Sequence, residues 1–340
     1  MIKKEGRVLI DRTYIVTMRR KRGMHADVYE DFEKDIIKYT GWKAVRGSMN
    51  ILERVFEKYF LPRLKYRTFP FDLPGMNRSK IIFSSLSGVE YIKIFQRYIF
   101  KSKLKAIYQF DSWTHDNVIN ENAFRSFKIN IVFFSIRKAA EYFNSLMIPD
   151  FKAYWMPEAV NCASCRRRDY GEKDIDILQY GRRWERLHEQ LLPFCRTNAI
   201  NYQFPIENGN AKIQFKDREA LLVGLSKTRI AICVPRKITH PELYDLSTVT
   251  SRYFECMASK CLIFGHAPQD LIDLFGYNPV VEADYSDPAG QLKYLLDHYI
   301  DFVPMIEKNY KITEERHQWK NRIEDIKNIL DENTGFKGTP

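Results

Sequence analysis

The sequence predicts an α/β protein made of two Rossmann-like domains, each built from strand–helix–strand (βαβ) units. Three observations lead to this prediction. The chain has 340 residues, a length that favours two domains over one. Strand-like apolar runs alternate with helical segments from residue 79 to 156, and the alternation starts again at residue 174. The polar stretch 157–173 between them, which contains Arg166-Arg167-Arg168, is expected to be an interdomain linker.

The first domain is expected to span residues 1–156. Its opening part is the hardest to interpret: a strand-like run at 14–18 precedes the basic cluster 19–22, and two helical segments follow. Runs of β-branched and aromatic residues then predict further strands, and the segments between them predict helices. The expected strands are 80–85, 104–110, 129–134 and 152–156, and the expected helices are 26–39, 47–60, 88–100 and 136–143.

The second domain is expected to span residues 174–303. Its first helix, 184–194, is indicated by apolar residues at the spacing of one helical face. Residues 289–330 form a nearly continuous helical tail. The expected strands are 174–180, 198–204, 230–234, 261–264 and 279–281, and the other expected helices are 218–225 and 253–259.

The charge and the composition limit the classes of function. Lys and Arg number 54 against 43 Asp and Glu, a net charge of +11, which favours an anionic partner: nucleic acid, a phosphorylated small molecule or an anionic membrane surface. There is no GxGxxG and no Walker A pattern, so a dinucleotide oxidoreductase and a P-loop nucleotidase are not supported. No apolar run approaches the roughly 20 residues of a membrane span, and no secretory signal is visible, so a cytoplasmic protein is expected.

Cysteine usage gives no metal site. The six cysteines do not form a disulfide scaffold in a chain of this length. Cys162 and Cys165 make a single CxxC pair without a second pair or a suitably spaced His, so zinc is not expected. No metal cofactor is predicted.

Basic residues follow two strands of the second domain. Gly181-Arg182-Arg183 comes at the carboxyl end of the first strand and opens a helix, a place where α/β proteins bind phosphate. Arg236 comes just after the third strand, 230–234, and is a second candidate for phosphate contact. The alternative is that these arginines are only solvated.

The segment Ser251-Arg252-Tyr253-Phe254-Glu255 is the sharpest signal. A hydroxyl and an arginine at a helix start suit a diphosphate, and a glutamate one turn later can accept both hydroxyls of a ribose. The alternative is an N-cap at Thr250 or Ser251 with a carboxylate that favours the helix dipole.

The stretch from Asp174 to Leu296 resembles the donor domain of GT-B glycosyltransferases, of the family-4-like group 1 type. The resemblance covers about residues 80 to 320. It lies in Asp174-Ile175-Asp176-Ile177-Leu178 with Gly181-Arg182, in Ser251 to Ala258, and in Cys261-Leu262-Ile263-Phe264. Residues 154–160 are similar to the Pro-containing hinge before that domain, and residues 105–113 resemble the acceptor-side strand whose tip faces the cleft.

The resemblance implies two domains that face a cleft, with the C-terminal helices, 304–330, crossing back to the first domain. It implies that Glu255 binds the donor ribose and that Ser251, Arg252 and Gly181-Arg182 bind the diphosphate without a metal. Arg183, Arg236 and Tyr253 complete the predicted nucleotide-sugar site.

Two residues depart from the family pattern. The retaining enzymes of the family usually carry two glutamates eight residues apart, whereas the earlier position here is Ser247. Lys260 replaces the small glycine usually found after the donor helix. An inverting enzyme needs a base on the first domain, for which Asp111 is the first candidate and His115 the next; the alternative for Asp111 is a turn cap.

The predicted function is transfer of a sugar from a nucleotide-diphosphate sugar to a hydroxyl of a glycan or lipid-linked acceptor, in cell-surface polysaccharide or glycoconjugate biosynthesis. The basic clusters 19–22 and 166–168 suit a peripheral position at the inner face of a membrane. The alternative is a non-catalytic protein that binds nucleic acid or another anion, although no known nucleic-acid-binding motif appears and nucleic acid is not expected. A third alternative is a GT-B scaffold that has lost its activity.

Overall fold

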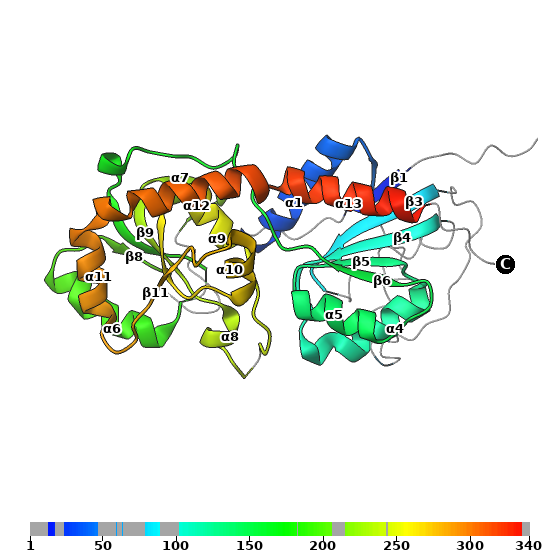
Figure 1. Ribbon diagram of the computed structural model, residues 1–340, viewed down its shortest axis with the longest axis horizontal. Helices are drawn as coiled ribbons and strands as arrows, with labels where there is room; N and C mark the ends of the chain where they lie inside the picture. The colour runs from blue at the N-terminus through cyan, green and yellow to red at the C-terminus, as the bar shows by residue number, and fades with distance from the viewer. Residues whose placement is uncertain are drawn as a thin grey trace, which may run out of the picture. The chain divides into compact units, whose positions relative to one another are not determined.

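The computed structural model describes residues 13–17, 24–46, 59, 63, 79–88, 102–181, 183–205, 215–242 and 244–334. They form two α/β units (Figure 1). Unit 1 comprises Met1–Arg22, Tyr29–Pro157 and Arg322–Pro340, and unit 2 comprises Gly23–Val28 and Glu158–Asn321.

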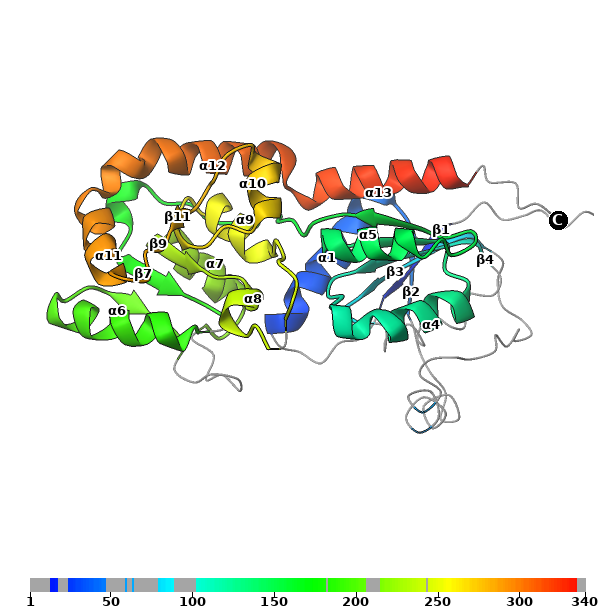
Figure 2. The same ribbon diagram turned by 60° about the horizontal axis from the view of Figure 1, so that its bottom comes forward.

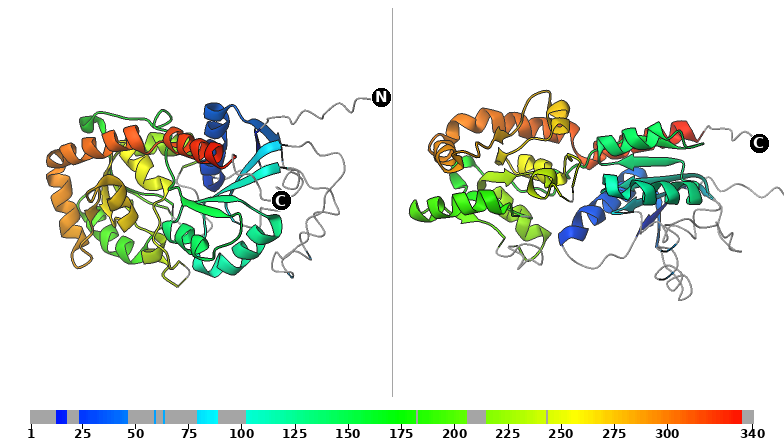
Figure 3. Two further views of the ribbon diagram at one scale, coloured as in Figure 1. Left: turned by 45° about the vertical axis from the view of Figure 1, so that its right-hand side comes forward. Right: turned by 90° about the horizontal axis from the view of Figure 1, so that it is seen from below.

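Unit 1 is built on a six-stranded parallel sheet with the order β2-β1-β3-β4-β5-β6. Phe32 of α1 packs against Phe83 and Tyr108, whereas Phe124 of α4 packs against Phe134 on the opposite face. Helices therefore lie on both faces of the sheet (Figure 3). The elements are β1 (Thr13–Thr17), α1 (Met24–Thr40), β2 (Lys43–Arg46), β3 (Ser79–Leu86), β4 (Ser102–Gln109), η2 (Thr114–Asp116), α4 (Asn117–Phe127), β5 (Ile131–Phe134), α5 (Arg137–Ser145) and β6 (Lys152–Trp155).

Unit 2 is built on a five-stranded parallel sheet with the order β11-β10-β9-β7-β8. One core lies between the sheet and α7, α9 and α10, and a second core lies between the other face and α6 and α11 (Figure 2). The elements up to α9 are η3 (Tyr170–Glu172), β7 (Ile175–Gln179), α6 (Glu185–Thr197), β8 (Tyr202–Gln203), α7 (Arg218–Ser226), β9 (Thr228–Cys233), α8 (Arg236–Thr239) and α9 (Ser251–Ala258). They continue with β10 (Leu262–Gly265), α10 (Gln269–Phe275), β11 (Val281–Glu282), α11 (Pro288–Asp297), η4 (Tyr299–Phe302) and α12 (Val303–Arg316).

The last helix, α13 (Trp319–Asn333), links the two units. Its first residues belong to unit 2, and from Arg322 onward the chain belongs to unit 1. Arg322 is buried, and its Nε donates to the carbonyl of Pro157 at 3.2 Å. Residues 304–321 of the predicted C-terminal helices thus belong to unit 2, and those from Arg322 onward belong to unit 1.

The predicted class, two parallel α/β units, is confirmed, but two elements of unit 1 were not foreseen. The sequence of helix α4 is largely polar. Its buried face includes the amide of Asn120 in place of an apolar side chain, which weakens the helical pattern of apolar residues. Strand β2 has only two apolar residues, Ala44 and Val45, and lies at the sheet edge. The helices predicted over 47–60 and 88–100 lie almost entirely outside the described residues.

The region between the two strand–helix series also differs from the expected linker. From Glu158 onward it lies in unit 2, where Val160, Cys162 and Cys165 are buried in the core beside α7 and α9. None of the helices among the described residues combines the length and apolar character that a membrane crossing requires.

In unit 2 the strands are parallel, so their carboxyl ends meet at one edge of the sheet. The connections after β7 and β9 start there. The helices α7 and α9 lead back into the strands β9 and β10, so their N-termini lie at the same edge. The candidate site is built on this edge.

Candidate functional site

The turn after β7 and the start of α9 meet at the carboxyl edge of the unit 2 sheet. Gly181 has φ +78°, a left-handed conformation that favours glycine, and the guanidinium of Arg252 occupies the space that a Cβ at this position would need. The same guanidinium lies 5.3 Å from the centre of the Tyr180 ring. The structure therefore brings together Gly181 and Arg252, two residues that the sequence placed in one phosphate site. Arg182 lies outside the described residues.

Glu255 is held by two side chains from other elements. Its Oε1 accepts a hydrogen bond from Nη1 of Arg218 at 2.6 Å, and its Oε2 accepts one from the hydroxyl of Tyr180 at 2.9 Å. Burial raises the pKa of Tyr180 far above its ordinary value, so the phenol keeps the proton that it donates. Arg218, Glu255, Tyr180, Arg252 and Gly181 form a continuous group of contacts, which we call the arginine–glutamate cluster.

A second carboxylate, that of Glu158, lies at the start of α9. Glu158 accepts a hydrogen bond from the backbone N–H of Ser251 at 2.7 Å, and the N-cap residue Thr250 makes no side-chain cap bond. A carboxylate at a helix N-terminus is stabilised by the helix dipole and by an N–H that has no partner within the helix. Ser251 is thus placed at the expected edge, with its N–H bonded to Glu158.

Tyr253 faces the protein interior. Its side chain is buried, and its hydroxyl donates to the backbone carbonyl of His266 at 2.7 Å. Burial raises the pKa of Tyr253 far above its ordinary value, so the phenol remains a neutral donor. Tyr253 fixes the turn after β10 and is buried away from solvent.

The other two predicted arginines contact neighbouring protein groups. Nε of Arg183 donates to both carboxylate oxygens of Glu185, and its Nη1 donates to the carbonyl of Pro205 at 2.8 Å. These contacts connect the start of α6 to the end of β8. The guanidinium of Arg236 lies 5.2 Å from the centre of the Tyr244 ring.

Unit 1 has its own polar group at the carboxyl end of β4. Nε2 of Gln109 donates to the carbonyl of Asp111 at 3.0 Å and to Oδ1 of Asn120, whose Nδ2 donates to Oγ of Ser112 at 3.0 Å. Asp111 comes two residues after the end of this strand and is half-buried. His115 is exposed, with Nε2 3.5 Å from a carboxylate oxygen of Asp116. Both candidate bases therefore lie just beyond the end of β4.

Sequence reasoning missed three residues of the unit 2 site: Tyr180, Arg218 and Glu158. Each reaches the site by a contact with a residue that is distant in the sequence. Tyr180 contacts Arg252, 72 positions away, and Glu158 contacts Ser251, 93 positions away. Arg218 contacts Glu255, 37 positions away. One signal was present, because Arg218 begins the predicted helix 218–225, which starts at the edge where α9 begins. Asp217 indeed caps α7 by accepting the N–H of Ala220 at 2.8 Å.

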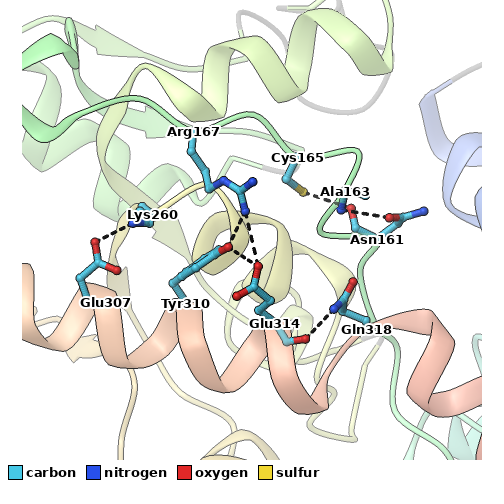
Figure 4. A network of polar contacts seen from close by, with 9 residues as sticks. All are labelled: Asn161, Ala163, Cys165, Arg167, Lys260, Glu307, Tyr310, Glu314 and Gln318. Atoms are coloured by element: carbon cyan, nitrogen blue, oxygen red, sulfur yellow. Dashed lines mark hydrogen bonds and ion pairs between the residues drawn. The ribbon is translucent and has the colours of Figure 1, made fainter.

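A further polar network joins α12 to the rest of unit 2, away from the carboxyl edge (Figure 4). Lys260 has φ +56°, the left-handed conformation usually taken by glycine, and its Nζ lies 2.7 Å from Glu307. Nη1 of Arg167 donates a hydrogen bond to the hydroxyl of Tyr310 and lies 3.7 Å from Oε1 of Glu314. Lys260 therefore adopts a backbone conformation that favours glycine and uses its side chain to hold α12.

The basic triplet 166–168 is partly neutralised within unit 2. Arg166 pairs with Glu219 at 2.7 Å, and Arg167 pairs with Glu314. Among the residues that the structure describes, no three His, Cys, Asp or Glu side chains are grouped so that they could hold a metal ion.

Residues 166–328 match a protein-family model described as glycosyl transferase-like. Solved structures are similar to nearly the whole chain. A sucrose-phosphate synthase from Thermosynechococcus elongatus is similar over 95% of this chain and 99% of its own, at 8% identity and a TM-score of 0.60. Anabaena HepE in complex with UDP-glucose is similar over 94% and 99%, at 8% identity and a TM-score of 0.58.

Staphylococcus aureus TarM is similar over 74% of this chain and 55% of its own, at 15% identity and a TM-score of 0.50. No curated protein sequence matches this chain. The similarities in structure confirm the predicted GT-B fold, and the family match confirms the resemblance of the second unit to group 1 glycosyltransferases.

Proposed function

We propose that this chain, whose residues 166–328 match a family model described as glycosyl transferase-like, transfers a sugar from a nucleotide-diphosphate sugar to a hydroxyl group of an acceptor. The observation that carries the proposal is the position of the Arg252 guanidinium directly over Gly181 at the carboxyl edge of the unit 2 sheet. Ligands of open α/β sheets bind at this edge, and a guanidinium there suits a phosphate group.

The charge of the arginine–glutamate cluster supports an anionic ligand. Arg218 and Arg252 bring two positive charges, Glu255 brings one negative charge, and Tyr180 is neutral, so the cluster has an excess of one positive charge. A partly buried arginine stabilises the negative charge that develops on a leaving diphosphate. Because side chains can supply this stabilisation, the proposed reaction needs no metal ion.

In the proposed reaction, unit 1 provides the residue that acts on the acceptor. Asp111 is the proposed base that removes the proton of the acceptor hydroxyl, with His115 as the alternative. The proposed acceptor is a glycan or a lipid-linked sugar in cell-surface polysaccharide or glycoconjugate synthesis. A peripheral position at an anionic membrane is part of this proposal, although two of the three arginines at 166–168 already pair with glutamates.

Calorimetric titration of the full chain with UDP, GDP, ADP and CDP, with and without Mg²⁺, tests the donor site. One nucleotide is expected to bind with an affinity that Mg²⁺ leaves unchanged and that Arg252→Ala lowers about 10- to 100-fold, the range for a lost charge-assisted hydrogen bond. Arg166→Ala is the matched control, because it removes an arginine from unit 2 outside the cluster. Absence of binding by all four nucleotides would overturn the proposal.

A further inference from the structure

The backbone N–H of Ser251, the first residue of α9, holds an anion that belongs to the chain itself. The carboxylate of Glu158 accepts this N–H at 2.7 Å. The first turn of α9 contains no acidic residue, and the N-cap residue Thr250 makes no side-chain cap bond. Glu158, 93 positions earlier in the chain, therefore supplies the negative charge that the positive end of a helix attracts.

The same place attracts a phosphate of the proposed donor. Arg252 follows Ser251, and its guanidinium lies directly over Gly181 at the carboxyl edge of the sheet. A backbone N–H has one hydrogen to donate, in contrast to a carboxylate oxygen, which can accept more than one bond. Two anions within about 3 Å of one N–H also repel each other strongly. A phosphate that bonds to the N–H of Ser251 therefore requires the carboxylate of Glu158 to leave.

The backbone of Glu158 is held on both sides. Before it, the carbonyl of Pro157 accepts from Nε of the buried Arg322 at 3.2 Å. After it, the N–H of Val160 donates to the carbonyl of His317 at 3.3 Å. The side chain of Glu158 itself is half-buried, so it is not enclosed by the protein. The carboxylate can therefore leave the start of α9 by side-chain rotation, without a movement of the chain.

We infer that the carboxylate of Glu158 occupies the place of a donor phosphate at the start of α9 and is displaced when the nucleoside diphosphate binds. This inference rests on the proposed function and concerns the regulation of the same site. The contact between Glu158 and Ser251 stabilises the nucleotide-free protein and is absent from the complex. Glu158 therefore acts as an internal competitor that lowers the affinity for the nucleotide.

Calorimetric titration of the full chain with UDP compares the wild type with three variants. Glu158→Ala removes the carboxylate. Glu158→Asp keeps the charge but shortens the side chain by about 1.5 Å, and the backbone bonds on both sides keep the chain from following it. Glu314→Ala is the matched control, because it removes a carboxylate of unit 2 that lies on α12, away from the carboxyl edge (Figure 4). If the nucleotide panel selects another base, that nucleoside diphosphate replaces UDP.

Glu158→Ala is expected to bind UDP about 3- to 30-fold more tightly than the wild type, the range that corresponds to the loss of a helix N-cap contact. Glu158→Asp is expected to bind more tightly as well, because its carboxylate no longer reaches the N–H of Ser251. Glu314→Ala is expected to keep the wild-type affinity. A purely structural role of Glu158 gives no tighter complex, since the loss of a structural contact weakens a binding site or leaves it unchanged.

Thermal unfolding of the same proteins gives a second measurement. Without nucleotide, Glu158→Ala is expected to unfold about 2 to 4 °C below the wild type, because the N–H of Ser251 has lost its partner. At saturating UDP this difference is expected to close, since the contact is absent from both complexes. A difference that persists at saturation would show that Glu158 keeps its bond in the complex, against the inference.

Two binding results would overturn the inference while the proposed function stands. In the first, a folded Glu158→Ala variant binds UDP with the wild-type affinity or more weakly. In the second, Glu158→Ala binds more tightly but Glu158→Asp does not, which identifies repulsion by a nearby charge without competition for the N–H of Ser251. If neither the wild type nor any variant binds a nucleoside diphosphate, the proposed function fails and the inference fails with it.

Discussion

The carboxyl edges of the two parallel sheets carry different kinds of polar contact. At the end of β4 in unit 1, Gln109, Asn120 and Ser112 are joined by hydrogen bonds between neutral groups. In unit 2, the buried carboxylate of Glu255 is held by the Arg218 guanidinium and a phenol. The same sheet architecture therefore supports a network of neutral side chains at the end of β4, close to Asp111, and a charged edge in unit 2, which suits an anion.

The largest expected effect concerns chemistry just beyond the end of β4. Asp111→Asn keeps the size of the side chain and removes its ability to accept a proton. We expect the acceptor-dependent release of nucleotide to fall 10²- to 10⁴-fold, the usual contribution of a general base. The rate is measured with a nucleotide sugar and simple acceptors such as glucose, N-acetylglucosamine and glycerol.

Nucleotide affinity of Asp111→Asn is expected to stay at the wild-type value, because the arginine–glutamate cluster consists of unit 2 residues. His115→Ala, in the neighbouring η2, is the matched variant. A full loss of rate in His115→Ala together with a normal rate in Asp111→Asn would transfer the role of base to His115.

The next effect concerns the stability of the charged edge. Arg218→Ala leaves the carboxylate of Glu255 buried beside a neutral phenol. We expect the free energy of unfolding to fall by about 3 kcal/mol, the lower end of the range for breaking a buried ion pair. Chemical denaturation followed by circular dichroism measures this change.

Arg166→Ala is a closely matched control. Arg166 pairs with Glu219, the residue after Arg218, and the two ion pairs have nearly equal lengths of 2.7 and 2.6 Å. Because the side chains of Arg166 and Glu219 are 59% and 74% exposed, losing this pair is expected to change stability by less than about 1 kcal/mol. Equal losses in the two variants would show that burial does not distinguish the pairs.

The network of neutral side chains at the end of β4 gives a smaller stability effect. Asn120 is fully buried and connects Gln109 to Ser112. Asn120→Ala removes these bonds without leaving an unpaired charge, so we expect a loss of about 2 kcal/mol. Hydrogen exchange of the β4 amides, compared with that of the β9 amides, reports whether the loss stays in unit 1. Faster exchange in β9 alone would contradict the assignment.

The free energy of unfolding should also depend on pH because one lysine of unit 1 has a lowered pKa. Burial, helped by the neighbouring charge of Lys128, lowers the pKa of Lys105 to about 8. Below pH 8 the folded state carries a partly buried charge, and the resulting penalty disappears as pH rises from 8 towards the ordinary value of 10.5. Lys105→Met is therefore expected to be more stable than the wild type at pH 7, by about 1 kcal/mol.

The difference between Lys105→Met and the wild type, measured by thermal denaturation from pH 7 to 10.5, should shrink with rising pH. Other groups that titrate in this range cancel in the comparison, because both proteins contain them. A difference that stays constant across this range would show that Lys105 is not destabilised by its charge.

The periodic strands of both units could be predicted from sequence because their apolar runs are bounded by turn residues. Helix α4 could not, since its buried position 120 is an amide whose partners, Gln109 and Ser112, come from a preceding segment. Prediction of the site from the sequence was limited for the same reason. Arg252 and Gly181 follow local patterns, whereas the pairing of Arg218 with Glu255 depends on how α7 and α9 pack together.

Lys260 could be predicted only in part from the sequence, and its substitution gives the smallest expected effect. The sequence marked it as a departure from a glycine, and the structure shows that the backbone keeps the left-handed conformation, with φ +56°. A non-glycine residue in this conformation costs about 1 to 2 kcal/mol. The ion pair with Glu307, whose side chains are 23% and 42% exposed, returns less than about 1 kcal/mol.

Lys260→Gly removes both the backbone cost and the ion pair, and it adds freedom to the unfolded chain, so its net effect should lie within about 0.5 kcal/mol of zero. Lys260→Ala removes the ion pair but keeps the backbone cost, so it should be about 1 kcal/mol less stable than Lys260→Gly. Chemical denaturation of the three proteins under one set of conditions separates the two contributions. If the alanine variant is as stable as the glycine variant, the left-handed backbone carries no measurable cost, and the ion pair alone explains the lysine.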